Sequence, residues 1–350
     1  MEQAVEEKVE PLCPVFGVCG GCAYQDLPYP RELALKKEQL LGIFNHELDL
    51  KGVVVDDVAA SPEPYHYRNR LDLTLLRIRS GDIFLGFQPA YHRNVVQIDS
   101  CAISRPEISA FLPELKRQGI AKLPDNYRTA NLVVRTGDDG RVAWGGIGRR
   151  SCRLSPDDYF WTEVRGKRIF YSLDTFFQAN LAILPAVLST LDRLIGPAED
   201  ATFFDLYAGV GLFAVGLSDK FSRVIMIEES SSSVDVARYN LEYHQLKHVE
   251  LIEGRIEDTV DRALQAAAGT RRIGIVDPPR RGLSATARNS LKAMTDFEQL
   301  YYLSCNPESL ARDLKEFVRS GWVLERIVPF DFFPKTKHLE TLVKLCHQES

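Results

Sequence analysis

Hydrophobic residues change their spacing three times along the 350-residue chain, and each spacing predicts a different kind of structure. Within residues 29–48 they recur on one face of an amphipathic helix. From about residue 52 the spacing becomes that of strands, and from about residue 176 strands and helices alternate. We therefore expect a helix, a β domain and an α/β domain, in that order. The helical face comprises Leu33, Leu40, Leu41, Phe44 and Leu48.

The middle of the chain is typical of an antiparallel β domain. Leu71, Leu73 and Leu75 alternate with polar residues, and a turn after them leads into a second strand at 83–87. Another hairpin is expected over residues 131–145, where a Gly-Asp-Asp-Gly turn separates two apolar runs. Two hairpins in succession predict a mainly antiparallel sheet.

The last half of the chain shows the rhythm of a doubly wound α/β sheet. Apolar strands are each followed by a helix-like stretch, and this alternation predicts parallel pairing. The final two strands, 322–330 and 339–346, have no helix between them, so they are expected to form an antiparallel edge pair. The strands of the alternating part are 202–207, 223–228, 249–252, 272–277 and 299–305.

Composition narrows the class of protein. No apolar run approaches the roughly 18 residues that a membrane-spanning helix needs, and the acidic residues 1–12 are unlike a secretory signal, so we expect a cytoplasmic protein. The net charge is −5, but residues 61–175 carry +5 between two acidic segments. A basic middle favours a surface that faces a polyanion, although ordinary solvated charge remains an alternative.

A glycine turn after the first α/β strand predicts a cofactor site. Gly209 and Gly211 lie between a strand and a helix, where a ligand can approach the backbone. Glu228 ends the next strand, where a carboxylate can accept hydrogen bonds from both hydroxyls of a ribose. NAD enzymes share this arrangement, so the turn alone leaves the cofactor open.

Two later strand ends carry the candidate chemistry. Asp277-Pro-Pro-Arg-Arg-Gly follows the fourth strand, at the edge where open α/β sheets bind ligands. Cys305 follows the fifth strand and precedes Asn306 and Pro307. A buried cysteine is most often a small hydrophobe. The place of Cys305 at a strand tip favours a nucleophile instead.

Together these segments resemble the uracil-5 RNA methyltransferases. The resemblance rests on FFQAN at 176–180, FDLYAGVGLFAV, DPPRRGL, SCNPESLARDL and FPKTKHLETLVKL, and it runs from about residue 13 to the C-terminus. It implies S-adenosyl-L-methionine as cofactor. It also implies a Rossmann-like class I methyltransferase domain of seven strands, the last one antiparallel, beside a second, mainly antiparallel β domain carrying an iron–sulfur cluster.

Carried over by position, the resemblance makes Gln178, Tyr207, Gly209, Glu228 and Asp277 contacts of the cofactor or the base. Two positions depart from the family pattern. Leu212 stands where relatives often have Asn, and Arg255 stands where they have Asn or Asp. Arg255 is expected to pair with Glu228 or to reach RNA rather than to contact adenine.

The resemblance assigns the chemistry to two residues. Carbon 5 of uracil is a poor nucleophile until a thiolate adds to carbon 6, and a base must then remove the hydrogen from carbon 5. Cys305 is the implied nucleophile and Glu340 the implied base, with His338 positioning or tuning that base. Asp277 is expected to accept a hydrogen bond from the uracil ring.

Four cysteines match the iron–sulfur subset of the same family. Cys13, Cys19 and Cys22 lie close together, and 78 residues separate Cys22 from Cys101. Thiolates in this pattern are the usual ligands of a [4Fe–4S] cluster. Four thiolates also make structural zinc sites, so zinc remains an alternative.

Only 12 residues precede Cys13, so the chain most resembles the 23S ribosomal RNA enzymes in a form without an N-terminal TRAM barrel. RNA capture then falls to the middle domain, with candidate arginines at 68, 70, 149, 150 and 153. We expect a monomer that binds ribosomal RNA, with transfer RNA as the alternative. The expected parts are 1–24 with 52–175 for the cluster and RNA, a helix at 25–51 packing on the catalytic domain, and 176–350 for catalysis.

Two interpretations of other kinds compete with this one. An exocyclic-amine methyltransferase would carry an aromatic residue where Arg280 stands, and it would have no use for Cys305 and Glu340. A noncatalytic RNA-binding iron–sulfur protein would not need the glycine turn. Binding of S-adenosyl-L-methionine separates the second of these from an enzyme.

Overall fold

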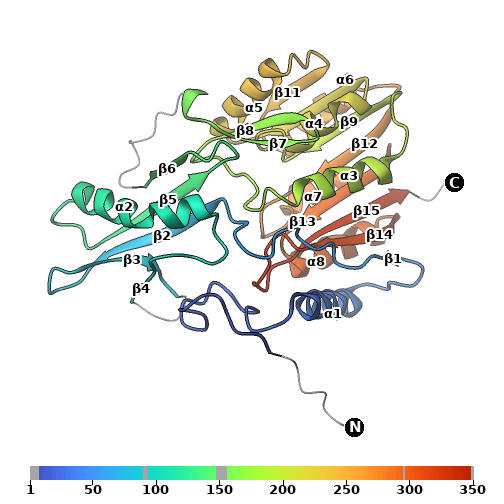
Figure 1. Cartoon of the computed structure of the whole chain (residues 1–350). Helices are drawn as coiled ribbons and strands as arrows, with labels where there is room; N and C mark the ends of the chain where they lie inside the picture. The colour runs from blue at the N-terminus through green and yellow to red at the C-terminus, as the bar shows by residue number, and fades with distance from the viewer. Residues whose placement is uncertain (1–7, 90–93, 147–155, 295, 348–350) are drawn as a thin grey trace, which may run out of the picture.

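The computed structural model describes residues 8–89, 94–146, 156–294 and 296–347. The chain forms a large α/β part and a smaller β part, with helix α1 (Tyr29–Glu47) lying against the former (Figure 1). The proposed RNA contacts Arg149, Arg150 and Arg153 lie outside the described residues.

The α/β part contains one mixed sheet of eight strands, in the order β1-β14-β15-β13-β12-β9-β10-β11. The run from β13 to β11 is parallel, as the alternation of strands and helices predicts. The strands are β9 (Ala201–Leu206), β10 (Arg223–Glu228), β11 (Val249–Glu253), β12 (Arg271–Val276), β13 (Phe297–Ser304), β14 (Trp322–Phe330), β15 (Glu340–His347) and β1 (Val54–Val55).

Helices cover both faces of this sheet, because successive strand residues point to opposite sides. Phe203 packs with helices of one face, and its neighbour Phe204 packs with helices of the other. The first face carries α3 (Leu184–Ile195), α4 (Leu212–Leu217) and α5 (Ser231–Tyr243). The second carries α1, α6 (Ile256–Ala266), α7 (Ala285–Lys292) and α8 (Pro307–Arg319).

The smaller part is a five-stranded antiparallel sheet covered by α2 (Pro106–Lys122). Leu71, Leu73 and Leu75 point into its core, which confirms the predicted alternation. The sheet has the order β4-β3-β2-β5-β6. Its strands are β2 (Arg70–Arg77), β3 (Ile83–Phe87), β4 (Val96–Gln97), β5 (Thr129–Thr136) and β6 (Val142–Gly145).

Two segments assigned to the β domain join the α/β part instead. Strand β1 pairs in parallel with β14 and forms the edge of the large sheet. The hairpin of β7 (Phe160–Val164) and β8 (Lys167–Tyr171) packs its apolar side chains with α3 and α5. The expected edge pair is antiparallel, but β15 lies between β13 and β14. Strand β1 has two residues, too few for a hydrophobic pattern to reveal its partner.

Buried charges connect α1 to the loop between β14 and β15. Lys36 lies 2.7 Å from Asp331 and 2.9 Å from Glu32, and all three side chains are almost fully buried. Glu32 also accepts the backbone N–H of Lys335 at 2.6 Å. The hydroxyl of Tyr29 donates to Asp331 at 2.9 Å. This group, Tyr29, Glu32, Lys36, Asp331 and Lys335, is called the α1 charge network below.

In the described part of the chain, no helix is both long enough and apolar enough to cross a membrane.

Candidate active site

Three neighbouring parallel strands end at the same edge of the sheet and carry the predicted site residues. Tyr207 follows β9, Asp277 follows β12 and Cys305 follows β13. Because the strands are parallel, the residues after their carboxyl ends meet on one edge. The order of the strands therefore brings together segments that are about a hundred residues apart in sequence.

The glycine turn is held by the carboxylate at the end of β10. Tyr207, Gly209 and Gly211 all have positive φ, at 67°, 56° and 93°. Glu228 accepts the N–H of Gly209 through Oε2 and that of Ser230 through Oε1, both at 2.8 Å. Each carboxylate oxygen retains a further lone pair for another donor. The turn and the acidic residue thus form one unit.

A narrow cavity of about 40 Å³ lies beside this unit. Tyr207 and Glu228 line it, together with the exposed Arg255 and Arg281. Ligand pockets commonly measure about 300–1,000 Å³, so this cavity is too small to enclose a whole nucleoside as it stands. The chemistry of its walls suits a nucleoside, since Glu228 offers acceptors to ribose hydroxyls.

The two positions that depart from the family pattern have local structural roles. Leu212 is buried in the core. Arg255 pairs with Glu257 at 3.0 Å and lies 3.8 Å from Glu229. Its ion pairs are thus with Glu257 and Glu229 rather than with the expected partner, Glu228.

A larger cavity of about 560 Å³ brings Cys305 and Glu340 together. Gln178 also lines it, and its side-chain amide donates to Asp277 at 3.3 Å. The predicted cofactor contacts are thus divided between two cavities, with Tyr207 and Glu228 beside one and Gln178 beside the other. The remaining walls are Arg68, Arg70, Asp72, Asp174, Phe176, Phe177, Ala179, Arg280, Phe333 and His338.

The carboxyls around Cys305 strongly affect its ionisation. Burial and the negative charges of Glu340 and Asp277 raise the pKa of the Cys305 thiol to about 12, and Arg280 opposes the shift. Burial and Asp277 raise the pKa of Glu340 well above its usual value, and Arg280 again opposes. Loss of hydration and the charge of Asp205 raise the pKa of Asp277 to about 7. Arg280 is thus the cation that opposes the rise in the pKa values of Cys305 and Glu340.

Arg280 is a site residue that the sequence reasoning did not assign to the reaction. Its guanidinium lies 3.1 Å from Nδ1 of His338, and because a guanidinium only donates, this ring nitrogen is the acceptor. The backbone carbonyl of Arg280 accepts hydrogen bonds from the side chains of Asn306 at 2.9 Å and Ser309 at 3.1 Å. The signal in the sequence was its place directly after the Asp-Pro-Pro turn.

His338 is neutral in this arrangement. Partial burial and the positive charges of Arg280 and Arg68 lower the pKa of His338. A neutral ring that accepts from Arg280 holds the guanidinium beside Cys305 rather than competing with it as a second cation. His338 was predicted to position Glu340, but the hydrogen bond that its ring makes is with Arg280.

A buried carboxylate on α8 fixes the loop after β12. Asp313 accepts the N–H of Leu283 at 2.9 Å and the hydroxyl of Tyr302 at 2.8 Å. It also pairs with Arg288 at 2.6 Å. The loop that carries Asp277 and Arg280 is thus anchored to the helix that follows Cys305. No spacing in the sequence indicated this role.

The four N-terminal cysteines meet at a different cavity, of about 230 Å³. Cys13, Cys19, Cys22 and Cys101 all line it. Burial raises the pKa of Cys22 to about 11, and neighbouring thiols add to the shift. Among the residues that the structure describes, no three His, Cys, Asp or Glu side chains are grouped closely enough to hold a metal ion. The cysteines therefore share a cavity without forming a closed metal site.

The described arginines proposed to bind RNA have partners within the protein. Arg70 pairs with Asp72 at 2.8 Å. The guanidinium of Arg68 lies 5.8 Å from the centre of the Phe333 ring, and its buried Nε has no hydrogen-bond partner in the described part of the chain. Arg68 lines both the cysteine cavity and the cavity of Cys305.

Comparisons with known proteins agree with this geometry. The model of the tRNA (Uracil-5-)-methyltransferase family matches residues 157–348. An uncharacterised RNA methyltransferase of Clostridium tetani is 28% identical over 398 residues, which span 98% of this chain and 85% of the relative. The 23S rRNA (uracil(1939)-C(5))-methyltransferase RlmD of Salmonella typhimurium is 27% identical over 368 residues, spanning 96% of this chain and 82% of the relative.

A solved structure shares the fold along most of the chain. It is the Pyrococcus abyssi tRNA (uracil-54, C5)-methyltransferase in complex with S-adenosyl-L-homocysteine, at a TM-score of 0.70 and 23% identity. The superposition covers 94% of this chain and 86% of that one. Identity at this level shows the common fold.

The ionisation of Cys305 gives a first test. In the RNA-free protein, alkylation of Cys305 by iodoacetamide should rise about tenfold per pH unit between roughly pH 7.5 and 9.5, because only the thiolate reacts and its pKa lies above this range. Arg280→Met should slow alkylation at every pH, since it removes the opposing cation. Mass spectrometry of the Cys305 peptide measures both rates. A plateau below about pH 9 would contradict the raised pKa.

Proposed function

Because the chain belongs to the uracil-5 RNA methyltransferase family, we propose that it methylates carbon 5 of one uridine in large-subunit ribosomal RNA through a covalent bond from Cys305. The observation that carries this proposal is the shared cavity of Cys305, Glu340 and Gln178. The target base enters this cavity after leaving its stack, because a stacked base exposes neither carbon 5 nor carbon 6 to such a pocket. The protein acts as a monomer.

Cys305 performs the first step of the proposed reaction. Its thiol releases a proton to water, and the sulfur bonds to carbon 6 of the uracil ring while the electron pair of the C5–C6 double bond moves toward carbon 5. Carbon 5 is then electron-rich and takes the methyl group, which S-adenosyl-L-methionine would supply from beside Tyr207 and Glu228, leaving S-adenosyl-L-homocysteine. Arg280 favours the step because its charge opposes the cost of forming a thiolate near two carboxyls.

Glu340 completes the reaction as the base. It takes the proton from carbon 5, the electron pair restores the ring double bond, and the bond between sulfur and carbon 6 breaks. A buried carboxyl with a raised pKa holds such a proton more firmly than an ordinary glutamate does. Gln178 and Asp277 are hydrogen-bonded to each other. They present an amide and a carboxyl to the polar edge of the uracil ring.

Ribosomal RNA is proposed as substrate because curated relatives over nearly the whole chain act on it. The Salmonella typhimurium and Enterobacter sp. proteins named as 23S rRNA uracil-C5 methyltransferases both span 96% of this chain. Arg68 and Arg70, at the rim of the cavity of Cys305, are proposed to contact the phosphates of the substrate.

We also propose that Cys13, Cys19, Cys22 and Cys101 bind a [4Fe–4S] cluster. Their common cavity of about 230 Å³ supports this assignment. Three closely spaced cysteines and one distant one are also a common arrangement of cluster ligands. The proposed role of the cluster is structural, because these cysteines lie outside the cavity of Cys305.

The order of the two steps predicts a trapped intermediate. Glu340→Gln should form the bond to carbon 6 and transfer the methyl group but fail to remove the proton, so enzyme and RNA should accumulate as an adduct that survives denaturing electrophoresis. Cys305→Ala should make neither adduct nor 5-methyluridine. The double variant should also form no adduct. Production of 5-methyluridine by Cys305→Ala would overturn the mechanism.

The choice of RNA has its own test. Large-subunit ribosomal RNA and bulk transfer RNA, both from a strain lacking the gene, should be assayed side by side. We expect 5-methyluridine at one position of the ribosomal RNA, mapped by mass spectrometry, and none in the transfer RNA. The reverse outcome would reassign the substrate while leaving the roles of Cys305 and Glu340 in place.

The cluster predicts a metal content. Protein purified without oxygen should contain about four irons, as the cluster type requires, and should absorb visible light. Cys13→Ser should lose iron and solubility while any protein that remains folded still binds S-adenosyl-L-methionine. Stoichiometric zinc without iron in the wild-type preparation would refute the cluster.

A further inference from the structure

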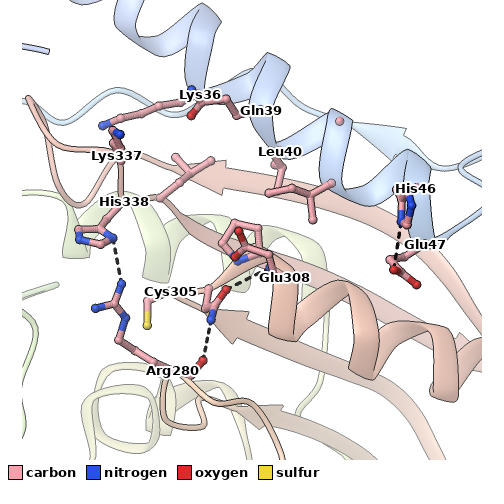
Figure 2. A pocket seen from close by; sticks show the side chains of 15 residues that line it. Lys36, Gln39, Leu40, His46, Glu47, Arg280, Cys305, Glu308, Lys337 and His338 are labelled. Atoms are coloured by element: carbon pink, nitrogen blue, oxygen red, sulfur yellow. Dashed lines mark hydrogen bonds and ion pairs between the residues drawn. The ribbon is translucent and has the colours of Figure 1, made fainter. Parts of the chain in front are cut away.

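A second, larger cavity adjoins the one that holds Glu340. It measures about 850 Å³ and shares Arg280, Cys305 and His338 with it. From these residues it extends along α1 toward His46 and Glu47 (Figure 2). One wall is α1, and the opposite wall is the start of α8. This cavity is called the α1 groove below.

The charges of the α1 groove are unevenly distributed. Arg280 lies beside Cys305, whereas the exposed Lys337 lies beyond His338, on the side of Lys36 (Figure 2). Lys337 has no ion pair with any residue in the described part of the chain. At the far end, Glu47 is neutralised by Lys315 at 2.8 Å, and the exposed Glu308 lies at the start of α8. Lys36 also lines the groove, but its charge is used in the α1 charge network. Of the two lysines that line the groove, Lys337 is therefore the one whose charge is free for an anion.

The wall formed by α1 contains a glycine that internal packing does not explain. Gly42 lies in the interior of the helix, where glycine costs about 1 kcal/mol relative to alanine. Apart from its chain neighbours and the backbone of its own helix, a Cβ at this position would have no atom of the described protein within 4 Å. Space for a ligand close to the helix backbone accounts for a glycine here.

A nucleotide inside a strand needs room for the chain on either side of it. The target uridine of the proposed function is joined to neighbours through two phosphates, and its base occupies the cavity of Glu340. The α1 groove begins beside the same Cys305 and leads away along the protein surface. It is thus placed to receive one of the two flanking segments.

We propose that the α1 groove binds the sugar–phosphate backbone of the RNA that adjoins the target uridine on one side, with Lys337 contacting a phosphate. This inference rests on the proposed function and adds the path of the substrate. An unpaired lysine is a suitable partner for a phosphate, and such contacts fix the position of the RNA without reading its sequence. The cofactor does not occupy this groove, because Tyr207 and Glu228 line a different cavity.

Filling the groove tests the proposal. Gly42→Trp places an indole in the open space, whereas Gly42→Ala keeps the groove and favours the helix. Ala34→Trp, at an exposed position of α1 outside the groove, controls for a tryptophan on this helix. We would measure binding to a ribosomal RNA fragment that contains the target uridine, without S-adenosyl-L-methionine. Only Gly42→Trp should bind more weakly. Its affinity should fall about tenfold or more if one to two contacts of about 1 kcal/mol are lost.

Shortened RNA separates a blocked path from a damaged fold. RNA fragments should be truncated next to the target uridine on its 5′ side or its 3′ side. The penalty of Gly42→Trp should disappear for one of these truncations and persist for the other. A penalty that persists for both, or equal binding by Gly42→Trp and wild type to every fragment, would overturn the proposal.

The lysine has an independent readout. Lys337→Gln should reduce the slope of log affinity against log salt concentration by about one, as expected for one lost phosphate contact. Lys247→Gln, at an exposed lysine before β11, should leave the slope unchanged. An unchanged slope in Lys337→Gln would overturn the contact.

The same fragments distinguish this inference from the proposed function. Wild-type protein that binds the fragments as described but makes no 5-methyluridine would refute the proposed function and retain the groove. Wild-type protein that methylates them while Gly42→Trp and Lys337→Gln match it in every measurement would retain the function and refute the groove.

Discussion

The α1 charge network is the constraint on which the geometry of the site depends. Lys36 and Asp331 are 295 residues apart in the chain and are buried together with Glu32. Removing one partner of such a pair leaves an uncompensated buried charge and costs about 3–5 kcal/mol. The pairs therefore fix the loop that leads from Asp331 to Glu340, and with it both the base and the wall of the α1 groove. Helix α1, which is not part of the large sheet, thus sets the position of Glu340 at the start of β15.

The electrostatics of the site follow from burying two carboxyls, Glu340 and Asp277, near one thiol. Burial raises the pKa values of Asp277, Glu340 and Cys305, Asp205 adds to the shift of Asp277, and Asp277 adds to the shifts of Glu340 and Cys305. Water would screen these charges, but the uracil ring must be enclosed in the cavity, and its enclosure excludes water. Arg280 supplies the compensating charge and is positioned by His338 and Asn306. The free protein consequently keeps its nucleophile as a thiol and protects it from side reactions.

Much of this architecture could be predicted from the sequence, because strand patterns and short motifs involve residues that are close together in the chain. The strands of the large sheet match the apolar runs, and Cys305 and Glu340 meet as expected. The structural roles of Arg280, Asp313 and Lys36 could not be predicted, because each depends on a partner that is distant in the chain. The pairing of β1 was missed for a related reason, since two residues carry no periodicity. Glu32 and Lys36 are buried on α1, so the buried face of this helix is not the purely apolar face from which the helix was predicted.

The link between the two ends of the chain has a consequence for how the protein is made. Ribosomes add about 5–20 residues per second, so the roughly 300 residues between Lys36 and Asp331 take about 15–60 s to synthesise. Throughout that interval Lys36 has Glu32 of its own helix but lacks Asp331, so α1 cannot complete its docking. The antiparallel sheet around β2 and β5, whose strand pairings all lie within the first half of the chain, can form in the meantime. Synthesis therefore delivers the smaller β part well before Cys305 is enclosed, and the last strand to emerge closes the molecule.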